Sequence, residues 1–279
     1  MFMLMVAVIQ CTDRVGLVAA IANVMAINGM NILSMREHVE LGSSMFFSRL
    51  ELSGEAAADI ITTQLQQVLP TDAIVQVNPL PQKRIAVLVT KEYHCLGDIL
   101  LRHHFNTLGA SVQCVIGNHA LLGDICGRFG IPFHHVPHDG IGKEQFEQNL
   151  LTTLLAYQFD YIVLAKFMRI LSPAFTAHFP LRIINIHHSF LPAFIGASPY
   201  KQAFDRGVKL IGATAHYVTS DLDEGPIIAQ QIIPVNHNFT AKDMVHAGRE
   251  IETAVLARAL SLLLADRVFV HNNKTIVFE

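Results

Sequence analysis

The sequence predicts an α/β protein of two parts, an N-terminal βαββαβ unit over residues 1–80 and a C-terminal unit over residues 84–279 with a mostly parallel sheet. Apolar segments with strand-like and helical periodicity alternate along the chain, as they do in α/β folds. Two prolines and a change of charge interrupt this pattern at Asn78–Lys83, which is typical of a domain boundary. The 279 residues are also enough to bury a core in each part.

The N-terminal part has the element order of a ferredoxin-like unit. Its first helix carries Leu17, Ile21 and Val24 at helical spacing, and two β-rich segments follow, which Gly42 joins as a hairpin. The expected elements are a strand at 2–11, a helix that opens at 13–16 and ends at Asn28–Gly29, strands at 31–41 and 43–53, a helix at 56–69 and a strand at 73–77.

After residue 84, strands alternate with helices, which implies a mostly parallel sheet. A long amphipathic helix with Thr240 as its N-cap is expected near the end, followed by a hairpin that turns at 272–274. The expected strands are 84–90, 111–117, 132–136, 161–167, 182–187, 209–219, 227–235, 268–271 and 275–278, and the expected helices are 94–108, 120–130, 142–158 and 240–267.

Composition and charge exclude several classes of protein. At 51% hydrophobic and 15% charged residues the chain is globular rather than disordered. Its net charge is -3 and it has no block of Lys and Arg, so a nucleic-acid partner is not expected. No apolar run approaches the roughly 20 residues of a membrane helix, and the apolar start lacks the features of a signal peptide. Four scattered cysteines indicate reduced thiols, and we expect a cytoplasmic protein without membrane contact.

The stretch 185–226 holds the residues most suited to chemistry. Asn185 and His187 are two apart near the carboxyl end of a predicted strand, so their side chains point to the same face. Ligands bind at such strand ends in open α/β sheets. A second strand carries His216 near its end and leads into the turn that contains Asp223. We therefore expect an amide, an imidazole and a carboxylate at one site.

Two motifs in this stretch resemble a known family. Asn-Ile-His-His-Ser-Phe-Leu-Pro at 185–192 and the later Asp-Glu-Gly-Pro at 223–226 are similar to the signature of formyltransferases that use formyltetrahydrofolate. With Lys-Glu-Tyr-His-Cys-Leu-Gly-Asp at 91–98, the whole chain resembles the formyltetrahydrofolate deformylase family. The resemblance implies hydrolysis of 10-formyltetrahydrofolate to tetrahydrofolate and formate. This reaction would balance one-carbon pools and supply formate for purine biosynthesis. The resemblance also implies a catalytic set of Asn185, His187 and Asp223.

Attack on a formyl carbon needs the chemistry that these three residues offer. The tetrahedral oxygen must be held by preorganised donors, such as the amide of Asn185 and a protonated His187. Asp223 can accept a proton or a hydrogen bond from the attacking water, and its charge stabilises positive charge on His187. A single Asn or His in a strand is more often a satisfied core residue, but three together favour a catalytic site.

The resemblance also implies where a folate pterin binds. One wall of the slot is the segment Met168, Arg169, Ile170 and Leu171, and the other is 217–223, which includes Tyr217 and Val218. Arg169 either meets the folate glutamate or packs on the surface. His216 matches a position beside the formyl group, and a structural role for it remains an alternative.

The N-terminal part carries a separate resemblance. Cys-Thr-Asp-Arg-Val-Gly-Leu-Val at 11–18 is similar to the ACT regulatory domain, which implies a possible amino-acid effector and a homo-oligomer, a dimer or tetramer. The alternative interpretation is that Asp13 caps a helix and Gly16 merely allows packing.

Two other functions stay open at this point. A formyltransferase acting on an amine such as glycinamide ribonucleotide has a related fold, but the turn 89–95 lacks the glycines that would expose backbone N–H groups to phosphate. An ACT-based amino-acid sensor with an inactive second part is the other alternative, against which the intact catalytic motif argues. His134, His135 and His138 form the tightest histidine cluster, yet no metal-ligand spacing such as His-Glu-x-x-His occurs. We therefore expect no metal and no cofactor.

Overall fold

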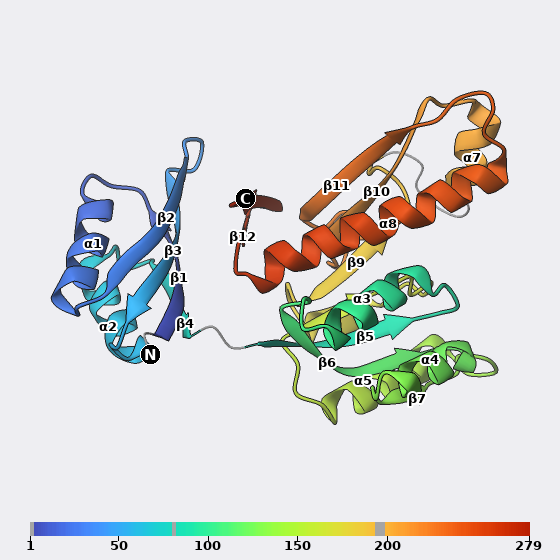
Figure 1. Ribbon diagram of the computed structural model, residues 1–279, viewed down its shortest axis with the longest axis horizontal. Coiled ribbons are helices and arrows are strands. Elements are labelled where there is room, and N and C mark those ends of the chain that lie inside the picture. Colours follow the sequence, from blue (N-terminus) through green and yellow to red (C-terminus); the bar gives the residue numbers. More distant parts are fainter. Residues whose placement is uncertain (1–2, 80–81, 193–198) are drawn as a thin grey trace. The chain divides into compact units, whose positions relative to one another are not determined.

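The structure, a computed structural model, describes residues 3–79, 82–192 and 199–279 (Figure 1). Residues 1 and 2 of the first predicted part, residues 80 and 81 of the predicted boundary, and residues 193–198 of the functional stretch lie outside the described residues. The chain divides into two compact units, which are described separately below. Among the described helices, none combines the length and the apolar character needed to cross a membrane.

The first unit has the predicted order βαββαβ. Its four strands form one antiparallel sheet in the order β2-β3-β1-β4, so that β1 lies between β3 and β4. The expected bounds are correct within about two residues, because strand-like and helical periodicity are both clear here. The elements are β1 (Met3–Thr12), α1 (Leu17–Ile27), β2 (Asn31–Glu40), β3 (Met45–Gly54), α2 (Ala58–Val68) and β4 (Ile74–Pro79).

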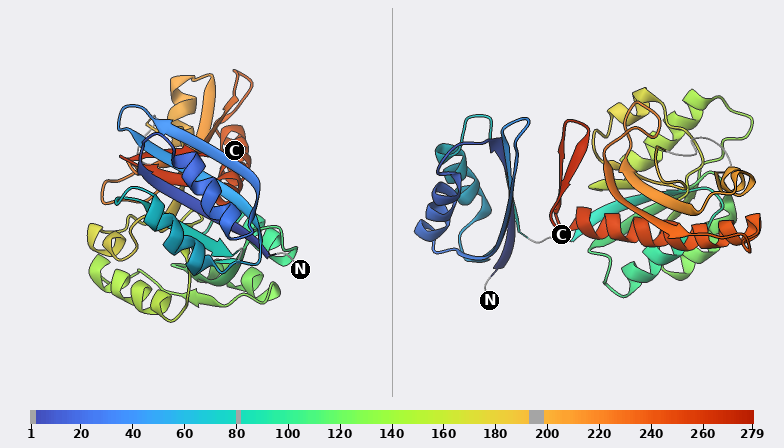
Figure 2. Two further views of the ribbon diagram at one scale, coloured as in Figure 1. Left: turned by 90° about the vertical axis from the view of Figure 1, so that its left-hand side faces the viewer. Right: turned by 90° about the horizontal axis from the view of Figure 1, so that it is seen from above.

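The core of the first unit lies between this sheet and its two helices, which cover one face (Figure 2). Alternate residues of β1, among them Ala7 and Ile9, are fully buried against Ile21 of α1 and Leu65 of α2. The residue before α1 is Gly16, whose φ of 94° favours glycine, and no side chain caps this helix. The alternative in which Asp13 caps the helix is therefore wrong.

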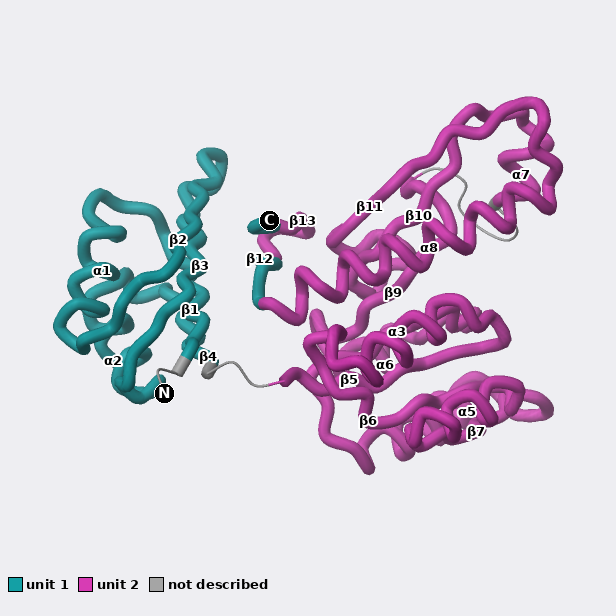
Figure 3. Tube along the Cα trace, in the orientation of Figure 1, with its two compact units in different colours: residues 1–81, 266–269, 277–279 teal, residues 82–265, 270–276 magenta. Residues whose placement is uncertain are grey.

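The end of the chain modifies the predicted domain bounds (Figure 3). Residues 266–269 and 277–279 group with residues 1–81, whereas the sequence prediction assigned all of 84–279 to the second part. The physical reason is aromatic packing, because Phe269 contacts Phe47 of β3 with ring centroids 5.6 Å apart and Phe278 at 5.5 Å. The predicted terminal hairpin is present as β12 (Val268–His271) and β13 (Lys274–Val277).

The second unit contains a seven-stranded sheet in the order β11-β10-β9-β8-β5-β6-β7. The five strands from β9 to β7 are parallel to one another. At one side of the sheet β10 pairs antiparallel with both β9 and β11, so the sheet is mostly parallel, as predicted. The strands are β5 (Lys83–Val89), β6 (Ala110–Gly117), β7 (Phe133–His135), β8 (Tyr161–Leu164), β9 (Ile183–His187), β10 (Leu210–Tyr217) and β11 (Ile227–Pro234).

Helices cover both faces of this sheet. The predicted cap is confirmed, since Thr240 and Asp243 form a reciprocal capping box at the start of α8. The short helices α6 and α7 were not predicted, because segments of five and eight residues carry too little periodicity. The helices are α3 (His94–His104), the 3₁₀ turn η1 (Ala120–Leu122), α4 (Gly123–Arg128), α5 (Lys143–Leu155), α6 (Pro173–Ala177), α7 (Pro199–Arg206) and α8 (Ala241–Leu264).

Candidate active site

A cavity of about 350 Å³ opens in the second unit beside β8, β9 and β10. The sheet explains its position, because β9 lies between the last parallel neighbour, β8, and the first antiparallel one, β10. The segments after β8 and β10 form its rim. Of the residues predicted from sequence, those that line it are Met168, Arg169, Ile170, Leu171, Asn185, His187, His216, Val218 and Asp223.

Tyr217 is the exception among the predicted residues. It is buried and does not line the cavity, whereas its neighbours His216 and Val218 do. Successive side chains on a strand point to opposite faces, so the side chain of Tyr217 lies away from the cavity, and its predicted contact with a ligand stays a prediction. Its backbone carbonyl nevertheless accepts a hydrogen bond from Nδ1 of His216, at 2.8 Å.

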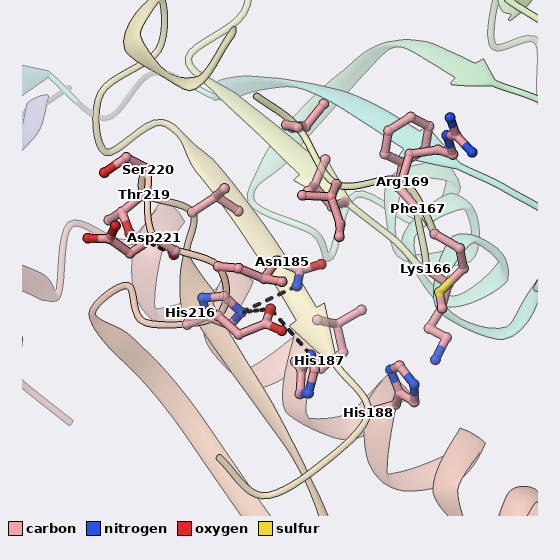
Figure 4. Close-up of a pocket in the computed structure, with 18 residues that line it drawn as sticks. Lys166, Phe167, Arg169, Asn185, His187, His188, His216, Thr219, Ser220 and Asp221 are labelled. Atoms are coloured by element: carbon pink, nitrogen blue, oxygen red, sulfur yellow. Dashed lines mark hydrogen bonds and ion pairs between the residues drawn. The ribbon is translucent and has the colours of Figure 1, made fainter. Parts of the chain in front are cut away.

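The amide, the imidazoles and the carboxylate converge on one wall (Figure 4). His216 is paired directly opposite Asn185 in the antiparallel ladder of β9 and β10, and Nδ2 of Asn185 lies 3.3 Å from Nε2 of His216. Oδ1 of Asp223 lies 3.4 Å from Nδ1 of His187 and 3.6 Å from Nε2 of His216. Since both contacts end on Oδ1, the second carboxylate oxygen can accept a hydrogen bond from a ligand.

The backbone around Asp223 is shaped for this contact. Asp223 itself has a φ of 57°, in the left-handed region that aspartate tolerates better than most residues. Gly225 comes so close to β10 that a Cβ there would lie 1.8 Å from the carbonyl oxygen of Tyr217. The Asp-Glu-Gly-Pro motif therefore needs its glycine to return the chain against the strand.

Electrostatics keep the carboxylate of Asp223 charged. Burial alone would raise the pKa of Asp223, but hydrogen bonds from His187 and His216, together with the charge of both rings, hold it well below its usual range. Within the described residues, Nε2 of His187 is buried and has no hydrogen-bond partner, although the ring lines the cavity. It is therefore free to bond to a ligand.

The predicted pterin wall presents apolar side chains to the cavity. Met168 and Ile170 line it and are 54% and 62% exposed, so their apolar surface is available to a ligand in the cavity. The backbone of this wall is anchored beside the end of β5, because the Met168 N–H donates to the hydroxyl of Thr90 at 2.9 Å. The guanidinium of Arg169 lies 5.9 Å from the ring centre of Phe146, so it packs on that ring at the edge of the cavity.

Sequence reasoning missed a group of buried polar residues next to these. Lys166 and His188 line the cavity, and behind them Glu252 of α8 is 1% exposed. Its carboxylate lies 3.1 Å from Nζ of Lys166 and 2.8 Å from Nε2 of His94, and it accepts a 2.7 Å hydrogen bond from the hydroxyl of Tyr200. We call His94, Lys166, Tyr200 and Glu252 the Glu252 cluster. In the sequence, its signals were a lysine near the end of an apolar predicted strand and a glutamate on the apolar face of a predicted helix.

Burial and charge shift the pKa values of this group. Burial raises the pKa of Glu252, but the hydrogen bond from His94, the charge of Lys166 and the hydrogen bond from Tyr200 outweigh it and lower the value to about 2. Burial lowers the pKa of His188 to about 4, and the charges of Lys166 and His187 act in the same direction. At neutral pH, Glu252 is therefore charged and His188 is neutral.

The histidine cluster singled out in the sequence does not converge. Nε2 of His134 is bonded to the hydroxyl of Tyr157 at 2.6 Å, and Nδ1 of His138 lies 3.3 Å from the amide of Asn118. Within the part of the chain that the structure describes, the group with metal-like spacing is His94, Cys95 and Glu252. The ammonium of Lys166 already neutralises that carboxylate, and burial raises the pKa of the Cys95 thiol, so these donors suit a cation poorly.

Comparison with known proteins agrees with this geometry. The formyl transferase family model matches residues 83–260. Formyltetrahydrofolate deformylase of Escherichia coli strain K12 is 49% identical, with 96% of this chain and 95% of the relative covered. A crystal structure of a formyltetrahydrofolate deformylase from Pseudomonas syringae superposes with a TM-score of 0.95 at 40% identity, over 99% of this chain and 94% of that one.

A more distant neighbour covers a smaller share of the chain. Glycinamide ribonucleotide transformylase 1 from Symbiobacterium toebii has a TM-score of 0.68 and 31% identity, over 71% of this chain and 95% of that one. The deformylases, in contrast, match nearly the full length of the chain. The chain belongs to the formyltetrahydrofolate deformylase family.

Proposed function

We propose that this protein hydrolyses 10-formyltetrahydrofolate to tetrahydrofolate and formate, with water as the formyl acceptor. The observation that carries the proposal is the convergence of Asn185, His187 and Asp223 on one wall of the cavity. Membership of the deformylase family supplies the substrate class. No metal or cofactor takes part in the proposed reaction.

Asn185 and His187 hold the oxygen of the tetrahedral intermediate. Nδ2 of Asn185 lies 3.3 Å from Nε2 of His216 at one side, and its amide N–H can donate to the formyl oxygen. Nε2 of His187 can donate to the same oxygen when the ring is protonated. Two preorganised donors in a partly enclosed site stabilise the developing charge more than water does.

Asp223 orients the water and stabilises positive charge on His187. Its carboxylate remains ionised, so its second oxygen can accept a hydrogen bond from the attacking water. As the carbon–nitrogen bond breaks, protonated His187 can deliver its proton to the leaving nitrogen of the folate, while the proton that the attacking water loses is taken up transiently by Asp223 and restores His187. The low pKa of Asp223 indicates that the carboxylate acts through hydrogen bonding and charge more than as a final proton store.

The pterin is proposed to bind against the segment Met168–Leu171, with Val218 and the loop up to Asp223 on the other side. Exposed apolar side chains suit a flat ring, and the ring nitrogens need backbone partners of the kind that these loops offer. In this proposal His216 orients Asp223, and Arg169 at the rim meets the folate glutamate.

The turn between β5 and α3 supports water over a phosphorylated acceptor. Glu92 lies 3.0 Å from Arg249 of α8, and His94 lies 2.8 Å from Glu252 of the same helix. These ion pairs hold bulky and acidic side chains where a phosphate would require open backbone N–H groups.

For the first unit we propose an ACT domain that regulates or assembles the enzyme. Its βαββαβ order and its edge strand β2, which among the described strands pairs with β3 alone, suit pairing with a second copy in a dimer or tetramer. An amino-acid effector would then bind at this unit. Four free, buried cysteines fit our expectation of a reducing compartment, the cytoplasm.

Incubation of the purified protein with 10-formyltetrahydrofolate alone tests the main proposal. Formate and tetrahydrofolate should appear in equal amounts, and added glycinamide ribonucleotide should change neither rate nor product. Transfer of the formyl group to the ribonucleotide, with no formate in its absence, would instead identify a transferase.

A further inference from the structure

The inner end of the cavity is closed by charged and polar side chains that the proposed reaction does not use. Lys166 and His188 line this end and lie together beyond His187 in Figure 4, away from Ser220 and Asp221. Lys166 is 8% exposed and has a φ of 62°, which is rare for a lysine. A strained, buried cation beside a reaction centre requires a reason, because burying it costs free energy.

The Glu252 cluster fixes Lys166 from behind. Both oxygens of Glu252 are engaged, one by Lys166 and His94 and the other by Tyr200. The cluster joins α3, the end of β8, α7 and α8, and the Tyr200 ring packs so tightly on α8 that a Cβ at Gly248 would lie 2.2 Å from it. The space behind Lys166 and His188 is therefore filled by protein.

A wall of this kind distinguishes between nucleophiles. An amine acceptor is larger than water, and a wall of buried side chains that are held in place leaves it less room than it leaves water. Water is small and neutral. The neutral ring of His188 offers one N–H donor and one nitrogen acceptor, which is enough to hold a water molecule close to the formyl carbon.

We propose that Lys166 and His188, fixed from behind by Glu252, form the acceptor end of the cavity and make the site specific for water over amines. This inference rests on the proposed function and assigns the choice of acceptor to residues outside the Asn185–His187–Asp223 set. The glycinamide ribonucleotide transformylase neighbour shows that the same unit also serves in enzymes named for an amine acceptor.

The experiment measures how the formyl group divides between water and an added amine. The full-length protein is incubated with 10-formyltetrahydrofolate and either hydroxylamine, which is small and largely neutral, or methylamine, which is protonated at neutral pH. N-formyl product and formate are quantified by mass spectrometry relative to total tetrahydrofolate. The unsubstituted protein should give formate with almost no N-formyl product from either amine.

The test variant is the double substitution Lys166→Met with Glu252→Gln, which removes both charges and leaves no buried charge unpaired. Its N-formyl fraction should rise about tenfold or more with hydroxylamine, since the ion pair that holds the wall rigid is removed. The matched control is Lys201→Met with Asp205→Asn, an exposed ion pair of 2.6 Å on α7, and it should divide the formyl group as the unsubstituted protein does.

An N-formyl fraction in the double variant equal to that of the unsubstituted protein would overturn the inference. A high yield of N-formyl product from the unsubstituted protein itself, equal to that of the double variant, would overturn it as well. If melting curves show that the double variant does not fold, Tyr200→Phe replaces it, because that change removes one 2.7 Å hydrogen bond to Glu252 and should raise the fraction about threefold. An unchanged fraction there rejects the inference. Absence of formate from the unsubstituted protein would reject the hydrolase proposal instead.

Discussion

The two units of the molecule bury polar side chains very differently. Among the described residues of the first unit, Arg49 is the buried charged side chain and Ser48 the buried polar one, and the other buried side chains are apolar. The second unit buries Lys166, His187, His216 and Glu252 around one cavity. Because buried charge is costly unless it is paired, this difference indicates that the second unit gives up stability for the chemistry of its site.

The largest expected effect comes from leaving one of these charges unpaired. Lys166→Met should lower the free energy of unfolding of the second unit by about 3–5 kcal/mol, because Glu252 then keeps a buried charge without its ammonium partner. Urea unfolding measures this loss. The added change Glu252→Gln should restore most of the lost free energy of unfolding. A Lys166→Met variant as stable as the unsubstituted protein would contradict the difference between the two units.

The catalytic wall gives the next largest effect. His187→Ala, Asn185→Ala or Asp223→Asn should each lower turnover at least about a hundredfold, since each removes a donor or acceptor on the reacting group. Circular dichroism checks that the fold is kept. Glu224→Gln, next to Asp223 but not in the cavity lining, is the control and should retain turnover. Normal turnover in a folded Asp223→Asn protein would take Asp223 out of the mechanism.

The pH dependence of stability should also separate the units. The folded pKa of His188, about 4, lies below the ordinary 6.5, so between these values the unfolded chain binds more protons. Stability of the second unit is therefore complete above about pH 6.5 and falls as the pH approaches 4, by on the order of 3 kcal/mol. Hydrogen exchange resolved by peptide can follow each unit. The His188→Asn variant should lose this dependence, and an equal slope in that variant would assign it to other groups.

How much of the site could be predicted from the sequence depends on how far apart along the chain the interacting residues lie. Strand periodicity alone places Asn185 and His187 on one face, and the family resemblance adds Asp223. The pairing of His216 with Asn185 depends on the register of two strands joined through a long connection, which periodicity does not specify. The same alternation predicts that the side chain of Tyr217 faces away from the cavity that His216 and Val218 line.

The Glu252 cluster lay beyond sequence reasoning for a different reason. Its members come from four elements, and His94 and Glu252 are 158 positions apart. Glu252 sits on the buried face of α8, where helical periodicity leads one to expect an apolar residue. A charged residue on an apolar helix face was the available signal, and it indicates a paired, buried group without identifying the partner.

A smaller effect is expected at the N-terminus of α8, outside the cavity. Thr240→Ala removes both hydroxyl bonds of the capping box and should cost about 1 kcal/mol of stability, because the first-turn N–H of Asp243 loses its acceptor. Thermal melting measures it. Turnover of the folded variant should be unchanged, and a hundredfold loss would show that the site depends on this helix end.

The smallest expected effect is that of chelation. Activity should survive prolonged dialysis against a strong chelator, since the carboxylate of Glu252 is neutralised by Lys166 at 3.1 Å and no ion is needed there. Turnover before and after dialysis checks this. Loss of activity that zinc or iron restores would show that His94, Cys95 and Glu252 hold a metal.

The attack of water on the formyl carbon at the wall of Asn185, His187 and Asp223 is tested most directly by oxygen labelling. A single turnover of 10-formyltetrahydrofolate is run in H₂¹⁸O, and the formate is analysed by mass spectrometry. Direct hydrolysis breaks the carbon–nitrogen bond and adds one solvent oxygen, so each formate should carry one ¹⁸O beside its original oxygen. The Asp223→Asn variant should release this labelled product at least about a hundredfold more slowly. Unlabelled formate, or labelled formate released by Asp223→Asn at the normal rate, would contradict the account.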